Sequence, residues 1–168
     1  VEGNSENLFD ELTSKYLSVI RQFNNIDQNK LNQLIKQIKN TKNIYIIGVH
    51  YSSLPAKHLV LGLQDLGINT YFAYDYMQAS HLYNTIHEDD LLIYFSIEGN
   101  QNNVSRFFDL TNASKNTYMI PKPKLLIENT LILPGYTLSK QSIVDLQSIV
   151  VIFVELLLNM FHNTLKED

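Results

Sequence analysis

The 168-residue sequence contains no cysteine and few charged side chains. The absence of cysteine excludes a disulfide framework and any thiolate metal site, and it fits a reducing compartment, so we expect a cytoplasmic protein. Only 18% of the residues are charged, and the net charge of -4 excludes a global positive field that would hold a nucleic-acid backbone. We therefore expect no direct DNA binding by these residues.

Long uninterrupted apolar runs are also missing. The most apolar window, 143–161, is interrupted by Asp145, Gln147, Ser148 and Glu155, whereas a membrane span needs about twenty nearly continuous apolar residues. This window predicts a buried helix, and no membrane partner is expected. No basic segment followed by an apolar stretch opens the chain, so no secretory signal is visible.

The chain does have enough apolar material for one core, because 45% of its residues are hydrophobic. Apolar spacing predicts a helix over 8–20, and Asp27 can cap a second helix that extends to Ile38. Strands and helices then alternate. Strands are predicted at 43–48, 69–73, 91–95, 116–120 and 130–133, and helices at 55–66, 77–86, 104–113 and 140–162.

This order predicts an α/β fold, a doubly wound, mainly parallel five-stranded sheet flanked by helices. Residues 1–41 are expected to form a helical lead-in, and 42–168 the domain proper. We interpret the apolar stripes of all these elements as core packing.

Two loops that follow predicted strands have an unusual composition. Ligands of open parallel sheets bind outside the carboxyl ends of the strands. The first loop begins at Gly48 and contains Ser52 and Ser53 before a helix whose first turn can hold Pro55. Backbone N–H groups and hydroxyls at such a place can face an anion.

The second loop places Ser96 at the strand end, followed by Gly99 and by the amides of Asn100 and Gln101. Together the two loops suit a phosphate group on a small polar ligand. The alternative is that these serines and asparagines only cap helices, as such residues commonly do.

These residues resemble a sugar isomerase (SIS) domain, and the resemblance covers most of the chain. It rests on the following residues: Gly48, Ser52, Ser53 and Ala56 in the first loop, Leu66–Gly67, Asp75, the segment 90–96, and Gly99. More narrowly, segments 26–38 and 42–48 resemble the linker and SIS domain of RpiR-type transcriptional regulators.

The resemblance implies a flavodoxin-like sheet, a homodimer, and binding of a phosphorylated sugar by the serine-rich loops, without catalysis and without a cofactor. Regulators of this type carry an N-terminal helix-turn-helix domain, which is absent from this sequence. Because the chain opens at Val1, we interpret it as an excised ligand-sensing domain, and we expect DNA contact only through the missing domain.

The sequence departs from the family pattern in both loops. The second phosphate loop of the family usually reads Ser-x-Ser-Gly-x-Thr, and here Glu98 replaces its second serine while Gln101 replaces its threonine. His50 stands where a glycine is common in the first loop. A carboxylate facing a phosphate costs affinity unless it points away or binds sugar hydroxyls. The ligand is then atypical, or the site is degenerate.

The histidines do not indicate a metal site. His58, His81, His87 and His162 form no pair at a metal-ligand spacing with a supporting carboxylate, so no metal is expected. His50 alone lies in a ligand loop, where it can donate to a phosphate or sugar oxygen, or fill a surface or packing role.

Three functions remain open. The leading hypothesis is a phosphosugar-binding sensor domain of a transcriptional regulator, which is not an enzyme. The second is a sugar-phosphate isomerase, for which His50 and Glu98 are the only candidates for the general base. Asp145 and Glu155 lie too far apart along one helix to act as an acid/base pair. The third is a dimerisation module with a degenerate pocket.

The closing helix, 140–162, is apolar around more than one face, so one sheet layer cannot cover it. We expect a homodimer in which this helix contributes to the contact, with Val151 and Phe153 at the seam. The alternative is that the first helix of the same chain covers part of it.

Overall fold

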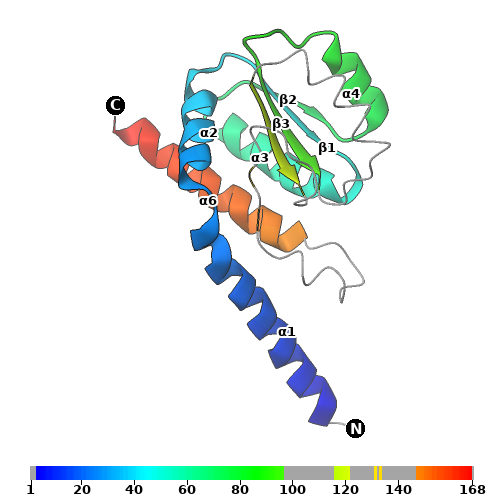
Figure 1. The fold of residues 1–168 in the computed structure, drawn as a ribbon. Helices are drawn as coiled ribbons and strands as arrows, with labels where there is room; N and C mark the ends of the chain where they lie inside the picture. The colour runs from blue at the N-terminus through cyan, green and yellow to red at the C-terminus, as the bar shows by residue number, and fades with distance from the viewer. Residues whose placement is uncertain (1–2, 97–115, 122–130, 132, 134–146, 168) are drawn as a thin grey trace.

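The computed structural model describes residues 3–96, 116–121, 131, 133 and 147–167 (Figure 1). The elements, with η for short 3-10 helices, are α1 (Gly3–Arg21), η1 (Gln22–Asn25), α2 (Gln28–Asn40), β1 (Ile44–Gly48), η2 (His50–Ser52), α3 (Ser53–Asp65), β2 (Thr70–Ala73), α4 (Tyr76–Tyr83), β3 (Leu91–Ser96), β4 (Asn116–Pro121) and α6 (Gln147–Lys166).

The four described strands form one parallel sheet in the order β2-β1-β3-β4. The predicted α/β class with a parallel sheet is confirmed. Of the fifth strand predicted at 130–133, the structure describes Leu131 and Leu133, which are buried and belong to no strand. The helix predicted at 104–113 lies outside the described residues.

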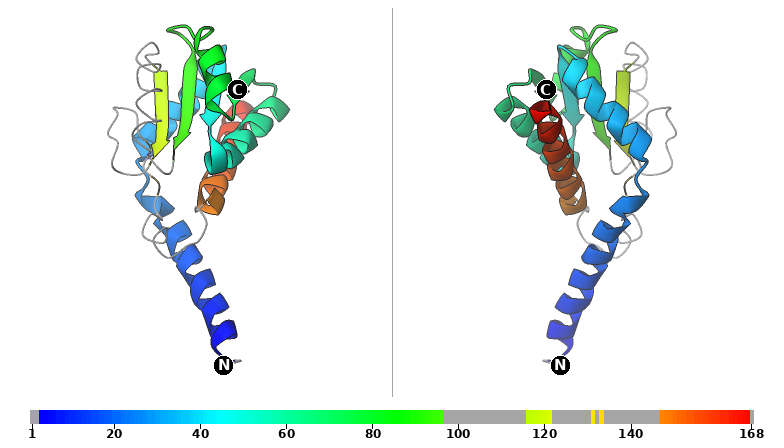
Figure 2. Two further views of the ribbon diagram at one scale, coloured as in Figure 1. Left: turned by 90° about the vertical axis from the view of Figure 1, so that its right-hand side faces the viewer. Right: turned by 90° about the vertical axis from the view of Figure 1, so that its left-hand side faces the viewer.

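Side chains of the central strands alternate between two cores. Ile44 and Ile46 of β1 face a large cluster that also contains residues of α2, α3 and α6. Tyr45 and Ile47 face a smaller cluster completed by Ala79 of α4. Both faces of β1 are therefore buried, as expected for a central strand with helices on both sides (Figure 2).

The residues that begin α2 and follow the end of α3 are ones that favour helix ends. Asp27 caps α2 by accepting hydrogen bonds from the backbone N–H groups of Asn29 (3.0 Å) and Lys30 (3.2 Å). Gly67 has a φ of 79°, and the N–H groups of Gly67 and Ile68 donate to carbonyls of the last turn of α3. This arrangement is a Schellman motif, which requires a left-handed residue and so favours glycine.

The lead-in and the domain share one core. Four apolar residues of α2 are buried in the large cluster with β1 and β3: Leu31, Leu34, Ile35 and Ile38. The expected domain boundary between residues 41 and 42 stays a prediction. α2 packs directly against the sheet, as one of the helices that cover it.

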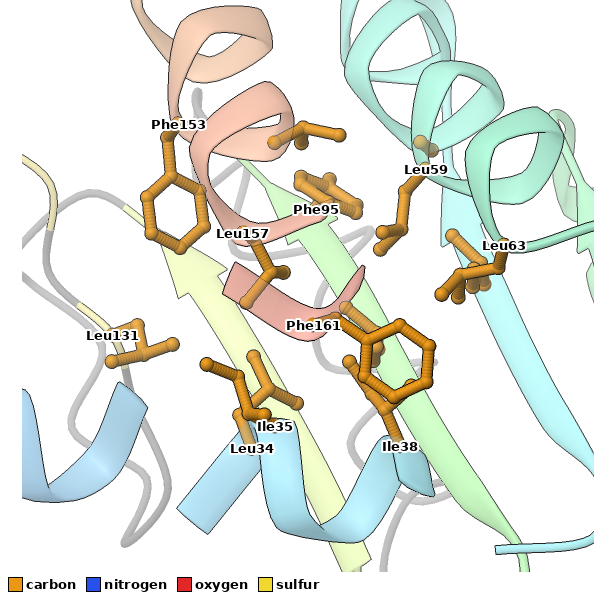
Figure 3. Packing of buried hydrophobic residues seen from close by; sticks show 14 of the residues in the cluster. Leu34, Ile35, Ile38, Leu59, Leu63, Phe95, Leu131, Phe153, Leu157 and Phe161 are labelled. Atoms are coloured by element: carbon orange, nitrogen blue, oxygen red, sulfur yellow. The ribbon is translucent and has the colours of Figure 1, made fainter. Parts of the chain in front are cut away.

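The apolar side chains of the closing helix α6 are covered mostly by other described residues of the chain. Its length and its mean hydropathy of 1.6 would by themselves allow a membrane span. Its buried side chains, including Phe153, Leu157 and Phe161, lie in the large cluster, which is the environment of a core helix (Figure 3). Because Phe153 is 2% exposed, it is not available at a dimer seam, contrary to our expectation.

The first helix covers the remaining face of α6 only with its last turns. Val19 is buried against Ile149 of α6, with Tyr16, Ile20 and Phe23 beside them. The alternative in which the first helix covers part of α6 is therefore realised. The rest of α1 projects away from the sheet and helices (Figures 1 and 2).

Candidate functional site

The two serine-containing loops leave the sheet at the same edge. β1 and β3 are parallel neighbours, and Gly48 pairs in register with Phe95, so Ser96 follows at the end of β3 one residue beyond that pair. β2 lies on the other side of β1, so the chain's progress across the sheet reverses between β1 and β3. Ligands of doubly wound sheets bind at this kind of switch point.

Gly48 lets the first helix after β1 approach the strand end closely. A methyl group at this position would collide with the carbonyl oxygen of Ser52 and lie 2.7 Å from the Cβ of Ala56. Only glycine fits without displacing the backbone. The amino-terminal turn of α3 is thereby held over the end of β1, where the dipole of the helix favours an anion.

The hydroxyls of the first loop have different surroundings. Ser52 is buried at 8% exposure and makes no side-chain cap hydrogen bond to α3, so it is not used as the helix cap. The Ser53 hydroxyl donates to the carbonyl oxygen of His50. Ser53 must turn away from that carbonyl before it can donate to a ligand, whereas Ser52 is not committed to capping.

His50 occupies a backbone conformation that suits glycine. Its φ of 57° lies in the left-handed region, and among the described non-glycine residues it is the one with positive φ. A side chain costs about 1–2 kcal/mol there. A glycine here, which the resemblance to the SIS family leads us to expect, would not carry this cost. The imidazole is exposed and packs edge-on against the Tyr51 ring, with centroids 4.6 Å apart.

The second loop falls mostly outside the described residues. The backbone of Ser96 ends β3, and Glu98, Gly99, Asn100 and Gln101 are not described. Their roles stay predictions, as does the pocket that they would form with Ser52 and Ser53.

Two aromatic residues at the same sheet edge were not among the site residues expected from the sequence. Tyr51 follows β1 and is 41% exposed, and Tyr74 follows β2 and is 52% exposed. An aromatic residue within three positions after a strand end was the available signal. Such rings can pack against the C–H face of a sugar. Nearby, burial raises the pKa of the Tyr76 phenol above its ordinary value.

Asp75, which carries part of the family resemblance, is a helix cap. Its carboxylate accepts a hydrogen bond of 2.8 Å from the backbone N–H of Gln78, and the Gln78 side chain accepts from the N–H of Tyr74. The buried Asp90 accepts from the N–H of His87 at the opposite, amino-terminal end of β3. Both carboxylates therefore serve backbone groups.

The remaining histidines lie away from this edge or at the surface. His58 of α3 lies 3.7 Å from the carboxylate of Glu155 on α6, so that this carboxylate faces an imidazole. Within the part of the chain that the structure describes, no three His, Asp or Glu side chains gather as metal ligands. Asp145 lies outside the described residues.

No protein-family model and no curated protein sequence matches the chain. Solved structures do. The sugar isomerase domain of an RpiR transcription factor from Sphaerobacter thermophilus has a TM-score of 0.76 at 16% identity, over 93% of this chain and 89% of the other.

Two further structures extend the comparison. A hypothetical Methanococcus jannaschii protein, for which a 3-hexulose-6-phosphate isomerase function was inferred, has a TM-score of 0.68 at 23% identity, covering 95% of this chain and 92% of the other. The Vibrio vulnificus NanR protein complexed with ManNAc-6P has a TM-score of 0.71 at 13% identity, covering 95% of this chain and 64% of the other. The chain therefore has the fold of SIS domains.

Proposed function

We propose that this chain is the ligand-sensing domain of a cytoplasmic transcriptional regulator and that it binds a phosphorylated sugar as a homodimer. The observation that carries the proposal is that two serine-containing loops begin at the same edge of the sheet, at the switch point between β1 and β3. The RpiR domain and the NanR complex support it, because their descriptions join this fold to transcription and to a phosphosugar.

The first loop supplies the phosphate subsite in this proposal. Gly48 brings the amino terminus of α3 against the end of β1, and Ser52 adds a hydroxyl that capping does not use. Backbone N–H groups at a helix start bind phosphate oxygens without a basic side chain. A net charge of -4 does not attract DNA, so DNA contact is assigned to a segment outside the 168 residues.

A thermal-shift screen tests the proposal. A ligand that binds only the native state at a hundredfold excess over its dissociation constant adds about 2.7 kcal/mol, which raises the melting temperature of a domain this size by about 5–10 °C. The panel contains pentose, hexose, hexulose and N-acetylhexosamine phosphates, with the free sugars and inorganic phosphate as controls. Stabilisation by no phosphosugar would contradict the proposal and favour the dimerisation module.

The isomerase is the second candidate, favoured by the function inferred for the Methanococcus jannaschii protein. Isomerisation requires a general base beside the sugar, and His50 and Glu98 are the available groups. Each phosphosugar that stabilises the protein is therefore incubated with it and analysed for its ketose or aldose isomer. We expect no turnover. Turnover that His50→Gln or Glu98→Gln abolishes would show that the protein is an enzyme and not a sensor domain.

Ser96→Ala should weaken phosphosugar binding by about 0.5–3 kcal/mol, the cost of losing one hydrogen bond to a neutral or charged partner. Isothermal titration measures the change, and Ser80→Ala on α4 serves as the control because its exposed hydroxyl donates to the Met77 carbonyl. An unchanged affinity would assign Ser96 to helix capping.

Glu98→Ser should tighten phosphosugar binding, because it restores a hydroxyl donor and removes a charge of the same sign as the phosphate. The comparison of the two dissociation constants at low and high salt separates charge from hydrogen bonding. Weaker binding by the variant would instead show that Glu98 holds sugar hydroxyls, and the ligand would be atypical.

A further inference from the structure

One face of α1 is apolar from Leu8 to Ile20, and the described residues cover only its second half. At 100° per residue, Leu8, Phe9 and Leu12 lie on the same face as Tyr16, Val19 and Ile20. The last three pack around Ile149 of α6. The first three are 53%, 72% and 42% exposed, respectively, and we call them the α1 stripe.

A second apolar surface, which none of the described residues covers, lies beside the base of α1. It is a groove of about 260 Å³ between α6 and the segment from η1 to α2. Phe23, Ile26 and Leu31 line one wall, and Leu156 and Met160 line the other. None of its lining residues is charged, and Leu156 is 46% exposed. We call it the α2–α6 groove.

We propose that the α1 stripe of one chain docks into the α2–α6 groove of a second copy, and that the reciprocal contact closes a twofold dimer. The proposal specifies the surface of the homodimer in the proposed function and is independent of whether a sugar phosphate binds.

The stripe cannot reach the groove of its own chain. Phe23, which lines the groove, comes two residues after the end of α1, and α1 projects away from the body from that point (Figures 1 and 2). A continuous helix cannot turn back onto a surface next to its own end. The stripe of another molecule approaches the groove from outside without this restriction.

Charge favours a second copy as the partner. The first twelve residues of α1 contain Glu6, Asp10 and Glu11 and no basic residue, whereas α2 contains Lys30, Lys36 and Lys39 and no acidic residue. Docking the start of α1 beside α2 of another chain joins segments of opposite sign.

The size of the interface also favours a second copy of the chain as the partner. A stable interface needs about 1,000 Å² or more in total, and a twofold axis makes each contact twice, so both stripes and both grooves are buried together.

Matched double variants provide the first test. Leu8→Glu/Phe9→Glu replaces side chains that are 53% and 72% exposed, and the control Leu61→Glu/Met77→Glu replaces side chains that are 52% and 73% exposed on α3 and α4. Sedimentation equilibrium should show a dimer for the natural chain and the control. The α1 variant should have a dissociation constant about tenfold higher or more, as expected for removing central apolar anchors.

Cysteine cross-linking provides the second test, because the natural chain has no cysteine. Chains with Leu12→Cys are mixed with chains with Met160→Cys under mild oxidation with diamide. Disulfide-linked dimers that contain one chain of each kind are expected. Circular dichroism checks that every variant keeps its helix content.

Three results would overturn the inference. They are a monomeric natural chain at high micromolar concentration, equal weakening by the control, and cross-links formed only between two Leu12→Cys chains. The second and third would leave a dimer with another interface, and none of the three affects the thermal-shift test of sugar binding.

Discussion

Phe161→Ala is expected to lower the free energy of unfolding by about 3–5 kcal/mol, the usual cost of deleting a buried aromatic ring. Phe161 has no exposed surface and belongs to the cluster shared by α2, α3, α6 and the sheet. In Figure 3 its ring points into this cluster, which also contains Ile38 and Leu63. Its loss therefore leaves a cavity where the helical layer meets the strands.

Urea unfolding measures the effect, and Leu165→Ala is the control on the same helix. Leu165 is 36% exposed, so the free energy of unfolding should fall by less than about 1 kcal/mol. Equal destabilisation by both variants would contradict the placement of α6 as a core helix. A small effect of Phe161→Ala alone would do the same.

Gly48→Ala is expected to abolish detectable phosphosugar binding and to lower the free energy of unfolding by about 1–3 kcal/mol, as overpacking usually does. The added methyl group collides with the backbone of Ser52, which cannot rotate away as the end of a flexible side chain could. The first turn of α3 must then move away from β1. The N–H groups that would hold the phosphate move with it.

His50→Gly is the control for stability in the same loop. Residue 50 has a φ of 57°, which glycine adopts freely. The His50→Gly variant should therefore be at least as stable as the natural chain. Isothermal titration and thermal unfolding are measured for both variants. Full affinity in a folded Gly48→Ala protein would contradict the assignment of this loop to the phosphate subsite.

The parts of the fold that depend on local sequence could be predicted. The residue types around Asp27 and Gly67 determine where α2 begins and α3 ends, because a carboxylate cap and a left-handed turn need only neighbouring backbone. The segment 43–48 is apolar on both faces, which is typical of a central parallel strand. The meeting of Gly48 and Ser96 at one edge followed from the alternation of strands and helices.

The features that depend on tertiary contacts could not be predicted. Phe153 and Val151 are neighbours in one apolar run, and only the packing of α6 makes Phe153 a core residue. The apolar pattern of α1 predicts a helix with one buried face, but it does not show that the cover ends near Tyr16. The Ser53 hydrogen bond to His50 depends on the short helix η2, which has no sequence signature of its own.

The central claim is that a phosphorylated sugar binds at the edge of the sheet where β1 and β3 end. An NMR titration of the isotope-labelled chain tests it most directly, with the panel phosphosugar that gives the largest thermal shift and with its free sugar as control. If the claim holds, saturable changes are concentrated at the amide signals of Gly48–Ser53 and of 96–101, with little change in α1 and α6. Absence of saturable change with every phosphosugar of the panel, or changes centred on the α2–α6 groove, would contradict it.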